Sequence, residues 1–360
     1  MRRPYLIWLT FYLPIILVFC FTLHVPISIS LAESPQPQTD KPQYFLRIGT
    51  IAPAGISYMK YVDKLMSELE KLTDHRVKVK LYPAGVLGDE PAMVKMVQEG
   101  ELDGAVLTTL SLGEVAPETL VLSLPYLFRD EYEMEFIIEK YESIFVGYAR
   151  ERGIEILGLS PMGSAQIFST IPILKPDELR DRKVGCPEKS KFFTEFFRSA
   201  RWQSPVSLSL SKVQSALSSG KVEVVFGNAA GVVLLGWYPY IRHTVMECFS
   251  VAFVVAFVNS DWYQNLPEEI RSTITKVSRE QRKKMLKWAR RDDEIAMLGL
   301  MKRGVNIIRW SPEDMEKQRE ASKTFWDFGV GKWYPQKLLD DILRDLEEYR
   351  AAKGTTEHKH

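Results

Sequence analysis

The side chains that most often carry enzyme chemistry are few and scattered in this sequence of 360 residues. Its five histidines are His24, His75, His243, His358 and His360. This spacing does not fit most histidine-ligated metal sites, and three cysteines are too few for a cysteine-built zinc site or a disulfide framework. No GxSxG, GxGxxG, Walker A or HExxH motif occurs. We therefore predict no catalytic residue, no metal site and no cofactor.

The acidic residues form no recognisable catalytic pair. The adjacent acids Glu268-Glu269 and Asp292-Asp293 fall on predicted helix surfaces, where solvation accounts for them. A carboxylate pair assembled from distant segments would escape this search. The charges balance, with 47 Lys and Arg against 46 Asp and Glu, which argues against a nucleic-acid binder that relies on net positive charge. The sequence favours a binding protein over an enzyme, and no nucleic-acid partner is expected.

The N-terminus predicts export across a membrane. Arg2 and Arg3 precede an apolar run over residues 4–31, and Ser30-Leu31-Ala32 places small residues before a cleavage point. We interpret residues 1–32 as a signal peptide and the Pro-rich residues 33–43 as a flexible tether. A retained membrane anchor is the alternative, which Pro14, Pro26 and the Ser-rich end of the run disfavour. The predicted location is the periplasm.

Two cysteines, Cys186 and Cys248, follow the predicted signal peptide. In an oxidising compartment they could form a disulfide, or both could be buried as small apolar side chains. The sequence favours burial.

The residues after the tether alternate between strand and helix patterns. Strands are expected at 44–51, 77–82 and 102–107, with helices beginning near Ser57 and Asp89 between them. After a helix at 131–152, a second series of strands and helices is expected over 154–226, and its first strand is expected at 154–159. A buried strand at 250–259, a long helix at 267–301, a strand at 305–310 and helices at 312–328 and 335–353 complete the chain. This order is typical of parallel sheets flanked by helices.

Open sheets of this kind bind ligands beyond the carboxyl ends of their strands. Thr108, Thr109, Gly227 and Asn228 follow predicted strands directly and are therefore candidate ligand contacts. An exported protein with two such domains and no catalytic groups is predicted to be a ligand receptor whose cleft closes by a hinge.

Several segments resemble the DctP family, the periplasmic solute receptors of TRAP transporters. They are residues 49–58 (GTIAPAGISY), 82–90 (YPAGVLGDE), 94–105 (VKMVQEGELDGA), 124–129 (LPYLFR) and 213–220 (VQSALSSG). The resemblance covers roughly residues 44–345 in matching order.

This resemblance implies a two-lobed α/β fold of the periplasmic-binding-protein type, with a mostly parallel sheet in each lobe and a long helix spanning both. Lobe I would comprise 44–160 plus about 249–280, and lobe II 161–248 plus about 303–330, with the long helix at 267–301 and a C-terminal helix at 335–353. It also implies delivery of a captured solute to TRAP membrane permease subunits. Whether the chain forms a homodimer stays an open question.

One departure from the family pattern concerns the ligand. Typical members carry an arginine that forks onto a substrate carboxylate, and Gly185 stands at that position here. The later "DGxxN" segment of the family is replaced by residues 223–227 (EVVFG), with Asn228 just beyond. A small dicarboxylate is therefore disfavoured. Arg182, Lys189 or Arg198 could supply a displaced cation, although each resembles an ordinary surface charge.

The predicted ligand is a larger, partly apolar or weakly polar organic molecule, with an acid held by backbone N–H groups still open. The candidate walls of its site, besides Gly185 and Gly227, are aromatic or neutral: Tyr58, Thr108, Thr109, Gln166, Phe226, Asn228 and Trp237. Each aromatic could equally pack in a core. The alternative function is an interaction or sensory protein that keeps the receptor fold without a ligand.

Overall fold

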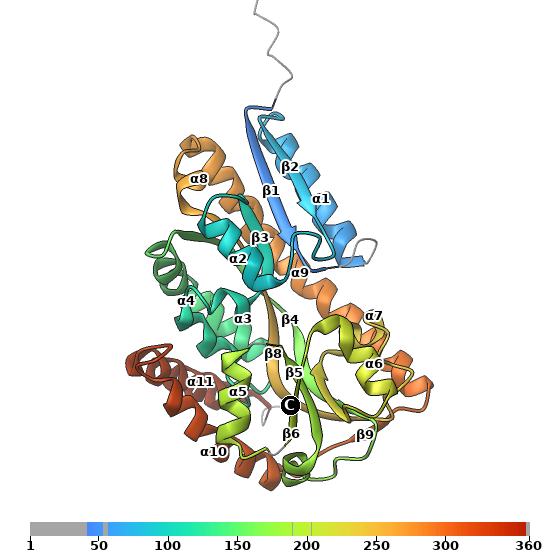
Figure 1. The fold of residues 1–360 in the computed structure, drawn as a ribbon. Helices are drawn as coiled ribbons and strands as arrows, with labels where there is room; N and C mark the ends of the chain where they lie inside the picture. Colours follow the sequence, from blue (N-terminus) through green and yellow to red (C-terminus); the bar gives the residue numbers. More distant parts are fainter. Residues whose placement is uncertain (1–41, 53–56, 189, 203, 358–360) are drawn as a thin grey trace, which may run out of the picture. The chain divides into compact units, whose positions relative to one another are not determined.

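The computed structural model describes residues 42–52, 57–188, 190–202 and 204–357. Within these residues nine strands form one hydrogen-bonded sheet in the order β2-β1-β3-β8-β4-β7-β5-β6, and β9 pairs with β8 (Figure 1). The strands are β1 (Tyr44–Thr50), β2 (Val77–Tyr82), β3 (Gly104–Thr108), β4 (Ile154–Ser169), β5 (Lys183–Pro187), β6 (Ser204–Leu208), β7 (Val224–Gly227), β8 (His243–Asn259) and β9 (Asn306–Ile308). The expected signal peptide and nearly all of the expected tether lie outside the described residues.

Two parallel groups of strands are joined by two long antiparallel strands. β2, β1 and β3 are mutually parallel, as are β7, β5 and β6. β8 and β4 run antiparallel between these groups and pair with each other along most of their length. The predicted class, α/β with mostly parallel sheets flanked by helices, is confirmed. The predicted lobe boundaries stay a prediction.

The predicted helices occur in the expected order, and the short α3 and α8 were not predicted. They are α1 (Ser57–Leu72), α2 (Glu90–Gln98), α3 (Thr109–Leu112), α4 (Glu131–Arg150), α5 (Lys191–Ser199), α6 (Val213–Ser218), α7 (Ala229–Leu234), α8 (Ser260–Gln264), α9 (Glu268–Lys302), α10 (Pro312–Gly329) and α11 (Gln336–Glu357), with 3-10 turns η1 (Pro117–Ser123), η2 (Pro176–Asp181) and η3 (Leu210–Lys212). Side-chain caps fix several starts: Asp130 accepts from the N–H groups of Tyr132 and Glu133, and Ser190 from that of Phe193. No described helix combines the length and the apolarity needed to cross a membrane.

Two strands are longer than the sequence pattern predicts. The expected strand at 154–159 continues through Ser169, and the expected strand at 250–259 begins at His243. β4 passes through irregular register at Ile156/Gly158, Pro161/Ser164 and Ala165/Ile167. These bulges break the period-2 alternation that marks a strand in sequence. β6 was not predicted.

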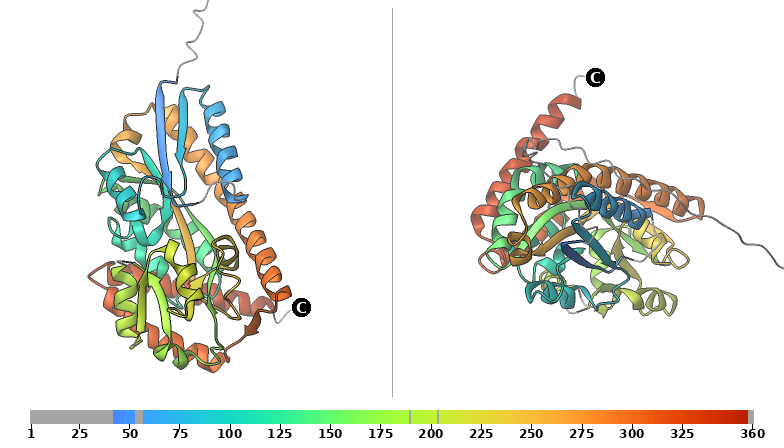
Figure 2. Two further views of the ribbon diagram at one scale, coloured as in Figure 1. Left: turned by 45° about the vertical axis from the view of Figure 1, so that its right-hand side comes forward. Right: turned by 90° about the horizontal axis from the view of Figure 1, so that it is seen from above.

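The long helix α9 is confirmed within one residue at each end of the predicted range 267–301. It contacts α1, β4 and α7, so one helix lies against both parallel groups of strands (Figures 1 and 2). Arg282 pairs with Glu142 of α4 at 3.0 Å. Arg290 pairs with Glu131 and Glu135, each at 3.3 Å. α4 and α9 are thus joined by an ion-pair network.

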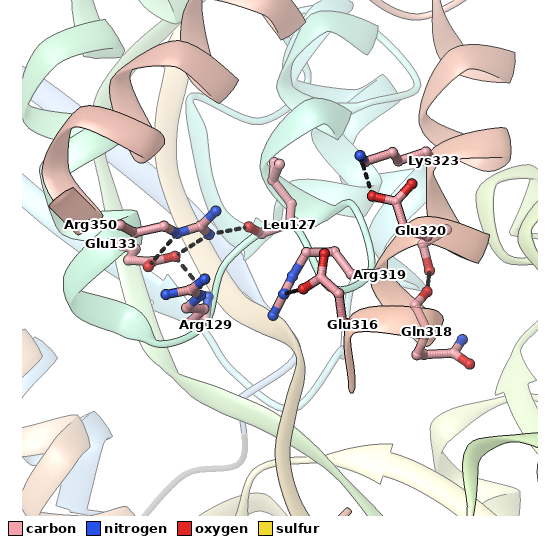
Figure 3. Close-up of polar contacts among 10 residues, drawn as sticks. Leu127, Arg129, Glu133, Glu316, Gln318, Arg319, Glu320, Lys323 and Arg350 are labelled. Atoms are coloured by element: carbon pink, nitrogen blue, oxygen red, sulfur yellow. Dashed lines mark hydrogen bonds and ion pairs between the residues drawn. The ribbon is translucent and has the colours of Figure 1, made fainter. Parts of the chain in front are cut away.

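The C-terminal helix α11 is held by a buried ion pair. The Arg350 guanidinium donates to both carboxylate oxygens of Glu133, at 2.8 and 2.6 Å, and to the carbonyl of Leu127 at 2.9 Å (Figure 3). The backbone N–H of Arg129 donates to the same carboxylate at 2.8 Å. Because Glu133 is 3% exposed, this carboxylate depends on these donors for its solvation.

Both described cysteines carry free thiols, Cys248 buried and Cys186 half-buried. Burial raises the pKa of the Cys248 thiol to about 12 and also raises that of Cys186. The structure thus agrees with burial as small apolar side chains and shows no disulfide between them.

Candidate functional site

A cavity of about 310 Å³ opens at the carboxyl ends of β1, β3 and β7. Thr50, Thr108 and Asn228 mark those three strand ends on its wall. The middle of β4 adds Met162, the middle of β8 adds Val254, and α9 closes one side. Both parallel groups of strands thus contribute to the cavity, at the place where open sheets of this class bind ligands.

The described lining is mainly apolar. Its apolar members are Ile51, Ala52, Val106, Leu107, Met162, Leu210, Ala230, Leu234, Leu235, Val254, Met285, Trp288 and Ala289. The charged side chains among the described lining residues are both acids, Glu90 and Asp292. Trp288 is 53% exposed and offers the cavity a flat apolar wall. Such a wall suits an organic ligand with apolar surface better than an anion.

Thr108 is fixed by the start of α2. Its backbone N–H donates to Glu90 Oε1 at 2.9 Å, and its hydroxyl donates to Glu90 Oε2 at 2.6 Å. The Ser111 hydroxyl donates to the same Oε2. Glu90 is itself placed by the Asp89 side chain, which accepts from the Ala92 N–H and caps α2. The segment 89–91 therefore anchors the end of β3 at the cavity.

Asn228 ties α7 to β4. Its side-chain oxygen accepts from the Gly231 N–H at 2.9 Å and caps α7, and its amide donates to the Met162 carbonyl at 2.7 Å. Gly163 follows Met162 with φ +110°, a conformation that L side chains rarely adopt. The β4 bulge and the end of β7 are thus locked together on the cavity wall.

Asp293 of α9 lies behind this wall. It accepts from the Ala230 N–H at 2.9 Å. Burial raises the pKa of Asp293 to about 6; the Ala230 hydrogen bond opposes this shift, and the negative charge of Glu131 adds to it.

This pKa predicts a pH dependence of stability. A carboxyl whose folded pKa lies above its unfolded value binds its proton more tightly in the native state, so its contribution to stability is greatest below about pH 4 and is lost as the pH rises to about 6. Asparagine does not titrate. Between pH 4 and pH 7 we therefore expect the wild type to lose roughly 1 to 3 kcal/mol more unfolding free energy than Asp293→Asn. Urea titrations at both pH values measure this, with exposed Glu294→Gln as the control. Equal pH dependence of wild type and Asp293→Asn would contradict the assignment.

Two of the predicted contacts, Thr108 and Asn228, line the cavity. Thr109 is buried and shares a hydrogen bond with Ser123 at 3.0 Å. Phe226 stacks on Phe249 with ring centroids 4.1 Å apart. Trp237 is 5% exposed and packs in a core beside β7. Both aromatic rings thus pack against other side chains.

Gly185, Gly227 and Gln166 are not among the described lining residues of the cavity. A Cβ at Gly185 would face Val222 and Val225, at 3.2 and 3.4 Å, and one at Gly227 would face Trp237 at 3.7 Å. Gln166 is paired with Gly227 across β4 and β7, and its buried side-chain oxygen has no hydrogen-bond partner among the described residues. Tyr58 lies in α1, and its side chain is outside the described part. The ligand role of all nine candidates stays a prediction.

None of the candidate replacement cations lines the cavity in the described structure. Arg198 pairs with Glu195 on the surface at 2.6 Å. Arg182 is half-buried outside the lining, and Lys189 lies outside the described residues.

Sequence reasoning missed the contribution of α9. Met285, Trp288 and Ala289 line the cavity at spacings of three and four residues, which place them on one helix face. That spacing is visible in the sequence, but none of the predicted ligand contacts lies in the expected helix 267–301. Met162 was also missed because it lies in the irregular part of β4.

Comparisons with known proteins point to one family. The family model described as bacterial extracellular solute-binding protein, family 7 (DctP) matches residues 48–332. The sialic acid-binding periplasmic protein SiaP of Vibrio cholerae is 20% identical over 301 residues, which cover 81% of this chain and 91% of that protein.

Solved structures share the fold. A TRAP periplasmic solute-binding protein from Xanthobacter autotrophicus with bound β-D-galacturonate has a TM-score of 0.75 at 20% identity, over 84% of this chain and 99% of that one. One from Desulfovibrio salexigens with bound orotic acid has a TM-score of 0.76 at 19% identity, over 86% and 99%.

Proposed function

Because the chain belongs to the DctP family of bacterial extracellular solute-binding proteins, we propose that it is the periplasmic receptor of a TRAP transporter and that its ligand is a small organic molecule held in the 310 Å³ cavity. The observation that carries this proposal is the position of the cavity at the carboxyl ends of β1, β3 and β7. The receptor would deliver its ligand to membrane permease subunits and perform no chemistry on it.

The lining supports a ligand more apolar than a simple dicarboxylate. The charged side chains of the described lining are acids, and this lining offers no Lys, Arg or His to neutralise an anion. A ligand carboxylate would depend on backbone N–H donors. Relatives of the same fold hold β-D-galacturonate and orotic acid, which supports a ring-sized organic ligand.

We expect succinate and malate to leave the melting temperature of the protein unchanged at millimolar concentration. Each carries two charges and little apolar surface, so desolvation in this cavity is not compensated. Organic ligands with added apolar bulk should raise the melting temperature, because a ligand held only by the native state stabilises it. Isothermal titration calorimetry checks the hits. Tight binding of succinate or malate, with no gain from apolar bulk, would refute the proposed ligand class.

A ligand-free interaction protein is the second candidate, favoured by the absence of the family arginine at Gly185. A cavity with hydrogen-bonded polar groups at its rim supports the receptor instead. Mass spectrometry of small molecules that co-purify with the native protein separates the two. A bound organic molecule supports the receptor, and a clean apo protein that no compound stabilises supports the interaction protein.

A further inference from the structure

A second, smaller cavity adjoins the first. It has a volume of about 100 Å³ and lies among α1, α9 and the sheet. Val106 of β3, Val254 of β8 and Met285 of α9 line both cavities. We call the smaller cavity the annex. The shared walls make the annex a side chamber of the proposed ligand site.

The annex is almost purely apolar. Its lining includes Leu46, Ile48, Val62, Leu65, Met66, Leu69, Val79, Leu157, Ala256, Ile274 and Val277. The described lining contains no charged residue, and its longest polar side chain, Gln281, is engaged with Glu68 at 2.8 Å. An enclosed apolar cavity of about 150 Å³ stays dry and binds benzene, so an apolar chamber of about 100 Å³ suits a small apolar group.

Small residues on two neighbouring strands create the annex. Gly158 of β4 pairs with Ala256 of β8, and Ser160 follows Gly158 by two residues on the same strand. A Cβ built at Gly158 would meet no atom within 4 Å. Protein interiors are usually packed without such voids, because each one forfeits packing energy in proportion to its volume. A void kept open beside a ligand site is accounted for if part of the ligand fills it.

We propose that the annex receives the apolar end of the ligand, whose polar end lies in the 310 Å³ cavity between Thr108 and Asn228. The ligand is then an elongated amphipathic molecule with a short alkyl or aromatic end. Met285 lies on the shared wall, and its flexible thioether side chain can adapt to ends of different shape. This inference rests on the proposed function, because it assigns a part of the same ligand.

Filling the annex tests the inference. Gly158→Leu places an isobutyl group in open space, and Gly299→Leu is its matched control, since Gly299 on α9 is also open around its Cβ and lines neither cavity. The first probe is benzene, and NMR measures whether it binds. Wild type and Gly299→Leu should bind benzene, and Gly158→Leu should not. Ala256→Leu, on the opposite strand, serves if Gly158→Leu fails to fold. Failure of wild type to bind benzene overturns the inference.

The second probes are straight-chain monocarboxylates from acetate to octanoate and the matching primary amines, by calorimetry. In wild type we expect affinity to rise about fourfold per added CH₂, from about 0.8 kcal/mol per buried CH₂, until the annex is full. Gly158→Leu should abolish this rise and Gly299→Leu should retain it. Equal rises in both variants, or no binding of either series, overturn the assignment. A different result would overturn the proposed function itself, namely that no co-purified or added organic molecule stabilises wild type. If a ligand binds wild type and Gly158→Leu equally, the proposed function is kept and only the role of the annex is overturned.

Discussion

Arg350→Met should lower the free energy of unfolding by about 3 to 5 kcal/mol, because it leaves the buried carboxylate of Glu133 without its cation. Arg350 supplies two guanidinium hydrogen bonds to that carboxylate, at 2.8 and 2.6 Å (Figure 3). It also joins α11 to the Leu127 carbonyl in the segment before α4. Methionine keeps much of the apolar stem and removes the charge and the donors, so the loss reports the ion pair. Urea unfolding followed by circular dichroism measures it.

The control for Arg350→Met lies more than three helical turns away on the same helix. Lys337 is 84% exposed and pairs with Asp341 at 2.7 Å, so Lys337→Met should cost less than about 0.5 kcal/mol. The double variant Arg350→Met with Glu133→Gln should recover part of the loss, since it removes the stranded charge. A loss from Arg350→Met no larger than that from Lys337→Met would contradict the buried role of this pair.

Ala289→Trp should weaken binding of the co-purified ligand at least about 100-fold, which corresponds to about 2.7 kcal/mol. Ala289 lines the cavity from α9, and an indole there occupies ligand space. Because the cavity holds about 310 Å³ and the site is half-buried, the fold should accept the larger side chain. Calorimetry measures the affinity, and urea unfolding verifies that the variant is folded.

Leu298→Trp is the matched control on the same helix. Leu298 is 56% exposed and lines neither described cavity, so its replacement should leave affinity within about twofold of wild type. Equal affinity of wild type and Ala289→Trp would show that the ligand binds elsewhere.

Local rules predicted much of this fold. The start of α2 follows from Asp89, Glu90 and Pro91, which combine a capping side chain, an acid in the first turn and a proline at a tolerated position. Apolar positions recur at helical spacing near both ends of the 35-residue α9, at Ile270, Ile274 and Val277 and again at Met297 and Leu300. These signals depend only on neighbouring residues, so a single sequence contains them.

The lengths of β4 and β8 could not be predicted in the same way. Pro161 and Gly163 interrupt β4 locally, and only pairing with β8 keeps the strand continuous across them. Gly163 reads in sequence as a turn residue, and its φ of +110° shows a bulge inside a strand. Pairing with β8 determines that these residues belong to a strand, and no local sequence pattern encodes that pairing.

The sequence predicted the cavity residues that lie at strand ends and missed those contributed by other elements. Thr108 and Asn228 line the cavity because the carboxyl end of a strand has a fixed place in an open sheet. Phe226 and Trp237 could be assigned only by knowing their neighbours, since an aromatic ring suits a core and a pocket alike. Trp288 lines the cavity from α9, where the charged residues around it in the sequence showed no sign of a binding site.

The central claim is that this receptor holds an organic ligand in the cavity at its strand ends without an arginine clamp. A crystal structure of the protein purified with its native ligand tests this most directly. We predict ligand density bounded by Thr108, Asn228 and Trp288, with its apolar end toward Met285 and no guanidinium on any ligand carboxylate. A ligand carboxylate forked by an arginine, or a ligand bound outside this cavity, would contradict the account.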